Sequence, residues 1–269
     1  MQPLGPPREI HLTVARKAVW KAITDPLELA RWFAPAARVT PGADGKVCLE
    51  WPGVGHLQFR VTIWNRPTRL RLELETPRAD GVVLDFQLRG TGHSTRLRVA
   101  VESTDAWSGP LGLLAGDDAE WELTLLTLRH YLEYHRGHDR TLASVTSQIS
   151  GNGWSAWNRL TVPGGLFGPR GLPDTIPGRR FRVEPVAGEG LRGRLLVSQP
   201  PDRLLGVLDT PQGSLFRCEV LSGAEGTRVR LRLSAWGSAA AEVARVESQW
   251  REGLPRLVSA TPEVSLLLE

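Results

Sequence analysis

The sequence predicts an α+β protein of two tandem domains, each a curved antiparallel sheet wrapped around one long C-terminal helix. Successive segments alternate apolar and charged residues, the period of strands that bury one face. Each set of segments is followed by a longer stretch with apolar residues at helical spacing. Short motifs also recur in the same order: Trp20/Trp157 with Thr24/Thr161, Pro67/Pro201, Thr95/Thr227 and Trp121/Trp250. A period of roughly 130 residues indicates a duplicated domain rather than a solenoid.

The first domain begins with a strand over 9–14, followed by a helix over 15–24. Asp25 and Pro26 form the start signal of a second short helix that ends at Trp32. Further strands are predicted over 55–64, 68–75, 82–88 and 97–101. In the first of these, the residues predicted to share the buried face are Leu57, Phe59, Val61 and Ile63. Arg96 and Arg98 point to the other face, where we expect acidic neighbours and a solvated, structural role.

A helix over 117–135 is predicted to cover the apolar face of this sheet. It begins with acidic residues and continues for about five turns. Its apolar stripe consists of Trp121, Leu125, Leu128 and Leu132. A sheet that is apolar on one face and a helix with one apolar stripe must pack against each other to exclude water.

The second domain repeats this pattern less clearly. We place the domains at 1–136 and 145–262, with a linker over 136–144. The terminal helix of the second copy, over 240–259, is expected to be shorter and to be weakened by Gly253 and Pro255. This copy is therefore predicted to be degenerate.

Composition excludes several classes of function. The formal net charge is +4, but basic residues alternate with acids and form no run, so nucleic-acid binding is not expected. No apolar run approaches the ~20 residues of a membrane span, and no signal-peptide core is present near Met1. The two cysteines, Cys48 and Cys218, occupy non-equivalent places in the two copies. Free thiols and a cytoplasmic location are therefore expected, without membrane insertion.

The segment 18–26, with the sequence Ala-Val-Trp-Lys-Ala-Ile-Thr-Asp-Pro, is followed by Leu29, Trp32 and Phe33. Together they resemble the opening motif of the activator of heat-shock-protein-90 ATPase homologue family, within the START-like (SRPBCC, birch-pollen-allergen-like) superfamily. The family's terminal helix carries a Trp followed by spaced leucines, as this chain does. The resemblance covers 8–135 and is weaker over 145–260. It implies a helix-grip fold with an apolar cavity between sheet and long helix, and it implies no particular reaction.

We expect the first domain to bind a small apolar or amphipathic ligand in this cavity without catalysing a reaction, and without cofactor or metal. The predicted lining residues are Trp32, Phe33, Trp51, Phe59, Ile63, Phe86, Leu88, Val99, Trp121, Leu125 and Leu128. The competing interpretation is that they form a closed core. An alternative function is a co-chaperone-like module in the stress response that docks on a chaperone of the heat-shock-protein-90 type. A third is a cyclase-like enzyme, which needs an acid–base pair directed into the cavity.

Three other features suggest chemistry more weakly. His130, His135 and His138 could bind zinc, but regular α-helical geometry separates the first two by about 140°. The segment 188–193 has the form Gly-x-Gly-x-x-Gly but precedes a predicted strand, whereas a dinucleotide site opens a helix. Candidate acid–base residues near a cavity mouth are Glu50, His56, Asp85 and His93, and strand alternation favours structural roles for Glu50 and Asp85.

Overall fold

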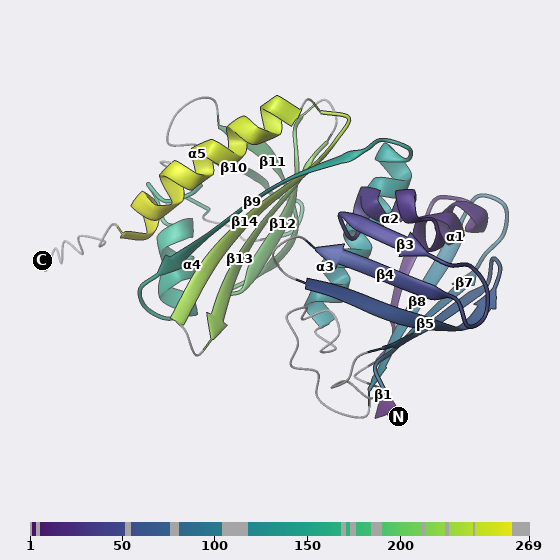
Figure 1. The fold of residues 1–269 in the computed structure, drawn as a ribbon. Coiled ribbons are helices and arrows are strands. Elements are labelled where there is room, and N and C mark those ends of the chain that lie inside the picture. The colour runs from purple at the N-terminus through teal and green to yellow at the C-terminus, as the bar shows by residue number, and fades with distance from the viewer. Residues whose placement is uncertain are drawn as a thin grey trace, which may run out of the picture. The chain divides into compact units, whose positions relative to one another are not determined.

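The computed structural model describes residues 2–3, 6–51, 55–75, 81–103, 118–167, 171–172, 176–183, 190–210, 213–223, 226–238 and 240–259. The chain divides into two units, Met1–Asp139 and Arg140–Glu269. Each contains one antiparallel sheet and one long helix, which confirms the predicted α+β class (Figure 1). Among the described helices, none is long and apolar enough to cross a membrane.

The first unit follows the predicted order of elements. Its strands are β1 (Gln2–Pro3), β2 (Arg8–Leu12), β3 (Ala36–Val39), β4 (Lys46–Trp51), β5 (Gly55–Asn65), β6 (Arg69–Leu74), β7 (Val83–Arg89) and β8 (Thr95–Ser103). Its helices are α1 (Arg16–Thr24), α2 (Pro26–Trp32) and α3 (Asp118–His130), and α3 continues into a π-helical turn, η2 (Tyr131–His135). The Asp25 carboxylate caps α2 by accepting hydrogen bonds from the backbone N–H groups of Leu27 and Glu28.

Within its described residues, the second unit has a similar plan with one short helix in place of two. Its strands are β9 (Arg140–Ile149), β10 (Arg180–Val183), β11 (Leu191–Gln199), β12 (Arg203–Leu208), β13 (Leu215–Gly223) and β14 (Gly226–Trp236), and its helices are α4 (Gly153–Thr161) and α5 (Ala240–Ser259). Since β9 begins at Arg140, residues 140–144 belong to the sheet and not to the expected linker. The terminal helix α5 spans 240–259, the predicted bounds. With 20 residues it is not shorter than α3 and η2 together, so the expectation of a shorter helix was wrong.

The two sheets have the same topology. The strands that match across the units run β2-β8-β7-β6-β5-β4 in the first and β9-β14-β13-β12-β11-β10 in the second. Both sheets also carry an irregularity at the equivalent place. The pairing of β5 with β6 shifts after Val61, and the pairing of β11 with β12 shifts after Leu195. Shared strand order and a shared bulge confirm that the chain contains two tandem copies of one fold.

The recurring Trp-x-x-x-Thr motif closes the first helix of each unit in the same way. The Thr24 hydroxyl donates to the Trp20 carbonyl at 2.7 Å, and the Thr161 hydroxyl donates to the Trp157 carbonyl at 2.9 Å. Both indole rings are buried. In each helix the threonine hydroxyl bonds the carbonyl four residues earlier, a local side-chain contact that threonine can make in the last helical turn.

The recurring threonine of the last strand ties that strand to the chain after the first strand. The Thr95 hydroxyl donates to the Val14 carbonyl at 2.8 Å, and the Thr227 hydroxyl donates to the Gly151 carbonyl at 2.8 Å. Both threonines are buried, so their hydroxyls require such acceptors. The repeated motifs are therefore the residues that join the elements of each unit.

The recurring tryptophan of the long helix packs on a phenylalanine near the middle of the sheet. In the first unit the rings of Trp121 and Phe86 lie 6.2 Å apart between centroids. In the second unit the rings of Trp250 and Phe216 lie 5.6 Å apart. Phe86 belongs to β7 and Phe216 to its counterpart β13, so the long helix contacts the sheet at matching points.

The cores of the two units differ where β4 pairs with β5 in the first unit and β10 pairs with β11 in the second. In the first unit Val47 on β4 lies opposite Phe59 on β5, whereas in the second Phe181 on β10 lies opposite Gly193 on β11. A Cβ atom on Gly193 would lie 2.8 Å from the Phe181 ring. The Phe181 ring also packs near Phe216, with centroids 5.8 Å apart. Gly193, the last glycine of the Gly-x-Gly-x-x-Gly pattern, therefore makes room for an aromatic ring within a sheet.

On the outer face of the first sheet, most charged side chains are paired across strands. Arg69 donates twice to the Asp85 carboxylate at 3.0 Å, and Arg60 pairs with Glu73 at 2.6 Å. The middle strands therefore carry acidic cross-strand neighbours for their arginines, and Asp85 among them is buried. Arg96 also has the acidic neighbour expected for it, because its Nε atom lies 3.2 Å from Glu9.

On the outer face of the second sheet, the buried Glu219 carboxylate binds several arginines. Arg232 donates a hydrogen bond to this carboxylate at 2.6 Å, and Arg230 donates another. Arg217 forms an ion pair with it. Burial alone would raise the pKa of Glu219. The guanidinium groups of Arg217, Arg232 and Arg230 outweigh burial and hold that pKa well below its ordinary value of 4.5.

The end of the long helix in the first unit is tied to α2 through Glu28. The Tyr131 hydroxyl donates to the Glu28 carboxylate at 2.6 Å and accepts from the Gly137 backbone N–H at 3.2 Å. Lys21 and Arg31 bind the other Glu28 oxygen at 3.2 and 3.3 Å. Burial and the Glu28 carboxylate raise the pKa of Tyr131 to about 12.

We expect Glu219→Gln to destabilise the protein by about 3 kcal/mol at neutral pH, because it leaves buried guanidinium groups without their counter-charge. The folded state keeps Glu219 charged to lower pH than the unfolded chain does, so this contribution is lost as the pH falls below 4.5. Urea unfolding of the full chain at several pH values measures both effects. Glu242→Gln, at an exposed acid of α5, is the control. Equal stabilities of the two variants would contradict the assignment.

We expect the Tyr131 hydroxyl to titrate with a pKa of about 12 in the folded protein. The chain has two tyrosines, so Tyr134→Phe leaves Tyr131 as the sole chromophore in a tyrosinate absorbance titration. Since the folded pKa exceeds the ordinary value of 10.0, the contribution of Tyr131 to stability is full below pH 10 and is lost as the pH rises through about 12. Tyr131→Phe should cost about 1–3 kcal/mol in urea unfolding at pH 8. A titration midpoint near 10 in the folded variant would overturn this expectation.

Candidate functional site

Most of the predicted lining residues of the first unit are buried, and the buried ones are referred to below as the apolar wall between sheet and α3. Those with at most 8% of their surface exposed are Trp32, Phe59, Phe86, Leu88, Val99, Trp121, Leu125 and Leu128. Phe33, Trp51 and Ile63 are partly exposed. Trp32 is also fixed by a hydrogen bond, because its indole N–H donates to the Ala22 carbonyl at 2.9 Å. Its position supports the packing of α2 on α1.

Ile63 does not share the buried face with Phe59 and Val61, contrary to the predicted alternation. The bulge in β5 shifts the register after Val61, so that Ile63 lies opposite Arg71 and Trp64 lies opposite Leu70. Trp64 instead packs edge-on against Trp20, with ring centroids 5.3 Å apart. A single additional residue in a strand reverses the faces of all residues that follow it.

Aromatic rings lead from the buried wall to the surface at the β3–β4 end of the sheet. Trp32 and Phe33 are stacked with centroids 5.0 Å apart, and Phe33 meets Trp51 edge-on at 5.6 Å. Trp51 is the last residue of β4 and also borders a surface hollow on the neighbouring strands. The apolar wall therefore reaches the surface beside a polar depression.

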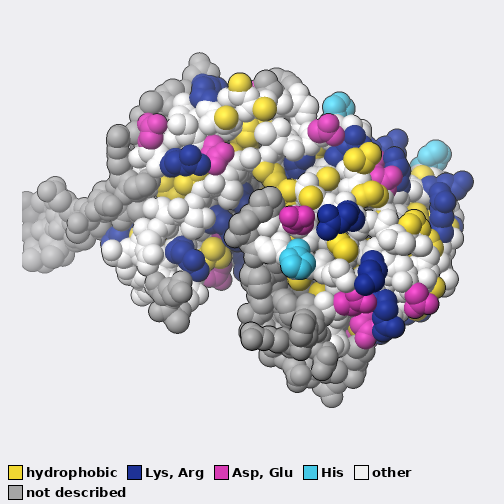
Figure 2. All heavy atoms as spheres, in the orientation of Figure 1, with side chains coloured by type: hydrophobic (Ala, Val, Ile, Leu, Met, Phe, Trp, Pro, Cys, Tyr) yellow, Lys and Arg dark blue, Asp and Glu magenta, His cyan; other side chains and the backbone are white. Residues whose placement is uncertain are grey.

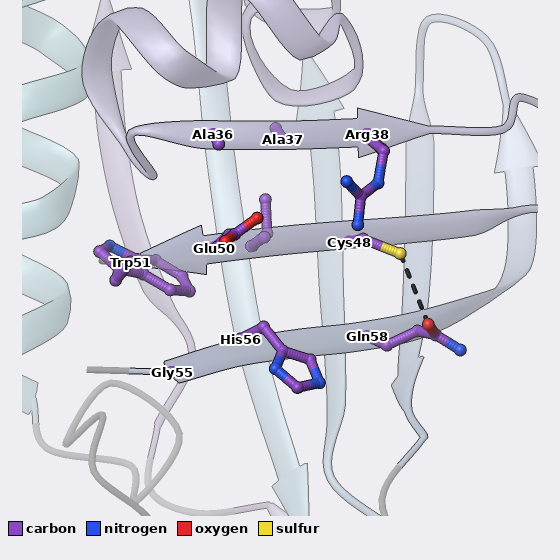
Figure 3. A pocket seen from close by; sticks show the side chains of 10 residues that line it. Ala36, Ala37, Arg38, Cys48, Glu50, Trp51, Gly55, His56 and Gln58 are labelled. Carbon is purple, nitrogen blue, oxygen red and sulfur yellow. Dashed lines mark hydrogen bonds between the residues drawn. The ribbon is translucent and has the colours of Figure 1, made fainter. Parts of the chain in front are cut away.

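This outer hollow lies over β3, β4 and β5 and has a volume of about 600 Å³ (Figure 3). Its lining residues are Ala36, Ala37, Arg38, Cys48, Leu49, Glu50, Trp51, Gly55, His56 and Gln58. Arg38 lies across from Cys48, and Glu50 lies across from His56, so these side chains share one face. Figure 3 shows Arg38 reaching from β3 towards β4 and Cys48 directed at Gln58, 3.6 Å from Sγ to Oε1.

The charges around the outer hollow differ from those on the middle strands. Within the described part of the chain, Arg38, Glu50 and His56 form no ion pair. Figure 2 shows basic, acidic and histidine side chains interspersed with apolar ones on this face of the first unit. The hollow thus offers both hydrogen-bond donors and acceptors next to an aromatic ring.

The acid–base candidates separate into two groups. Glu50 and His56 come together at the outer hollow. Asp85 is buried and is held by Arg69 and Gln87, and His93 is exposed in the turn between β7 and β8. Only the first pair is therefore available to a ligand in this hollow.

The π-helical turn brings His130 and His135 together, although regular α-helical geometry predicts that they diverge. Their Nε2 atoms lie 3.1 Å apart and both rings are buried. Five residues complete about one turn of a π-helix, so positions i and i+5 share a side. His138 is not the third member, since its Nδ1 lies 3.3 Å from the His135 backbone carbonyl. Among the described residues, no three His, Cys, Asp or Glu side chains form a metal-binding group.

The chain is similar to several solved structures. A search of curated proteins gave no match. The Aha1 dimer from Colwellia psychrerythraea is 18% identical, covering 47% of this chain and 94% of its own, with a TM-score of 0.41. The di-domain ARO/CYC protein BexL of the BE-7585A biosynthetic pathway is 14% identical, with coverages of 97% and 100% and a TM-score of 0.42. DynU16, a putative protein in the dynemicin biosynthetic locus, is 15% identical, with coverages of 94% and 96% and a TM-score of 0.41.

The family comparison concerns the first unit. Residues 13–133 match the model of the family described as activator of Hsp90 ATPase homolog 1-like protein. The matched segment begins just after β2 and ends within the π-helical turn, so it contains α1, α2, the sheet from β3 to β8 and α3. Over this segment the first unit is similar to the activator of Hsp90 ATPase homolog 1-like family.

Proposed function

We propose that the first unit binds a small amphipathic molecule at the β3–β4 end of its sheet. The apolar part of the ligand lies against Phe33 and Trp51 and extends towards the wall between sheet and α3. Its polar part lies in the outer hollow near Arg38, Glu50 and His56. The observation that carries the proposal is the position of Trp51, which contacts Phe33 and borders the hollow.

The partial exposure of Phe33 and Trp51 supports this assignment. Both rings expose apolar surface beside the hollow, whereas Trp32, Phe59 and Trp121 are buried. Removing apolar surface from water contributes about 25 cal/mol per Å², so a ligand that covers these rings gains affinity without opening the core. The buried members of the predicted lining then act as the support for the two exposed rings.

The uncommitted charges support a ligand with a polar end. Arg38, Glu50 and His56 keep their hydrogen-bonding capacity for a partner, in contrast to Arg60 and Glu73 on the neighbouring strands, which pair with each other. A hollow of about 600 Å³ is in the range of small-molecule sites. We therefore expect the aromatic rings to provide most of the affinity for the ligand and the charged rim of the hollow to orient it.

Native mass spectrometry of the intact chain purified from cells tests the proposal. We expect a reproducible small-molecule adduct that is lost on denaturation and can be identified after solvent extraction. The purified chain should also bind 1-anilinonaphthalene-8-sulfonate, an amphipathic probe, with a fluorescence increase. Trp51→Ala should weaken probe binding about tenfold, because the loss of one aromatic contact of about 1.4 kcal/mol corresponds to that factor.

The matched control is Trp154→Ala, which removes an exposed indole from α4 of the second unit. We expect it to leave probe affinity unchanged. If Trp51→Ala lowers the unfolding temperature strongly, Arg38→Gln replaces it, since Arg38 is an exposed rim residue. A clean apo mass together with equal probe affinities of all variants would contradict the proposal.

A second candidate function is docking on a chaperone of the Hsp90 type, and the description of the matched family favours it. This interpretation requires no ligand and predicts that the purified chain raises the ATPase rate of purified Hsp90. The rate measured with and without the full chain distinguishes the two. An unchanged ATPase rate would exclude the docking function for that chaperone.

A further inference from the structure

A second polar hollow lies on the outer face of the first sheet, over β2, β7 and β8. Its volume is about 230 Å³ and its lining residues are Glu9, Gln87, Arg89, Arg96 and Arg98. Strand register explains this grouping. Arg96 on β8 lies directly between Arg89 on β7 and His11 on β2, so three basic residues form a row across three strands.

Like charges opposite each other on neighbouring strands destabilise a sheet. The middle of the same face avoids this, because Arg69 pairs with Asp85 and Arg71 pairs with Glu102. Lys46 and Arg60 also lie opposite each other in this sheet, but each of them pairs with a glutamate. Among the described residues Arg89 has no such partner, so the row formed by Arg89 and Arg96 carries an electrostatic cost. A bound anion would remove this cost.

The acidic groups at this hollow do not neutralise it. Arg96 pairs with Glu9 at 3.2 Å, and His11 lies 3.8 Å from the same carboxylate. Arg98 donates to the neutral amide oxygen of Gln87 at 3.5 Å and lies opposite Glu9 on β2. Within the described residues, no carboxylate lies within ion-pair distance of Arg89 or Arg98. Three guanidinium groups against one carboxylate leave two net positive charges at the hollow.

We propose that this hollow binds the phosphate group of a phosphorylated small molecule. A phosphate monoester carries close to two negative charges at pH 7 and three acceptor oxygens, which matches the charge and the donors available here. Planar guanidinium groups bind such an anion through paired N–H donors. The site is separate in sequence from the β3–β5 hollow, so it does not depend on the proposed amphipathic ligand.

Thermal unfolding and calorimetric titration of the full chain with inorganic phosphate, at constant ionic strength set by chloride, test the site. We expect phosphate to raise the unfolding temperature of the wild type by linkage to binding. Arg89→Gln should raise the unfolding temperature without phosphate, because it removes a like charge from Arg96, and should weaken phosphate binding about tenfold. The opposite signs of these effects distinguish a binding site from an ordinary solvated arginine.

Arg60→Gln is the matched control, since it removes the same charge from the same face outside the hollow. It should leave the phosphate-induced shift unchanged. Co-sedimentation with vesicles of phosphatidic acid or of phosphatidylcholine identifies the source of the phosphate. Binding to phosphatidic acid vesicles alone indicates a lipid headgroup. Binding of inorganic phosphate without co-sedimentation indicates a soluble ligand. Equal unfolding temperatures in phosphate and chloride, without heat of binding or co-sedimentation, would overturn the proposal.

Discussion

In each unit, the contact between the indole of the long helix and a phenylalanine of the sheet determines which face of the sheet is buried and which face carries the charged residues. Trp121 meets Phe86 in the first copy, and Trp250 meets Phe216 in the second. A large ring buried at this point commits one face of the sheet to the helix, and strand alternation then turns the charged residues to the other face. Both hollows of the first unit lie on that polar face. The helix-facing surface provides stability, and the opposite surface remains available for recognition.

The polar face is divided into neutral and charged regions. Over β6 and β7, arginines and carboxylates bind one another and leave little capacity for a partner. At the two ends of the sheet the charged side chains are not all neutralised by ion pairs, and the two ends differ in the charges that remain. Near β3 both signs of charge lack partners beside an aromatic ring, whereas near β2 the basic groups outnumber the acid. These imbalances, rather than hollow size alone, assign a different ligand chemistry to each end.

The repeat motifs and strand alternation were sufficient to predict the class, the strand-rich plan and the long helix, because residues at matching positions make matching contacts. The bulge in β5 has no comparable signal, since Thr62 and Ile63 continue the alternating pattern and only pairing with β6 reveals the shift. The meeting of His130 and His135 depends on a π-helical turn that α-helical spacing excludes. Strand register, which single-strand patterns do not specify, brings Arg38, Glu50 and His56 to one hollow. The helix α5 continues through Gly253 and Pro255 despite their low helical propensity.

At equivalent positions of one strand pair, the first copy has Val47 and Phe59, and the second has Phe181 and Gly193. This difference limits the order in which the two positions can have changed. The large ring stands on β5 in the first copy and on β10, the counterpart of β4, in the second. A route that changes one position at a time passes through two facing rings or through two small side chains, that is, through overlap or a void. The substitutions at these two positions are therefore coupled. A hybrid domain that combines β4 of the first copy with β11 of the second, or β10 with β5, would have poorly fitting side chains between the two strands.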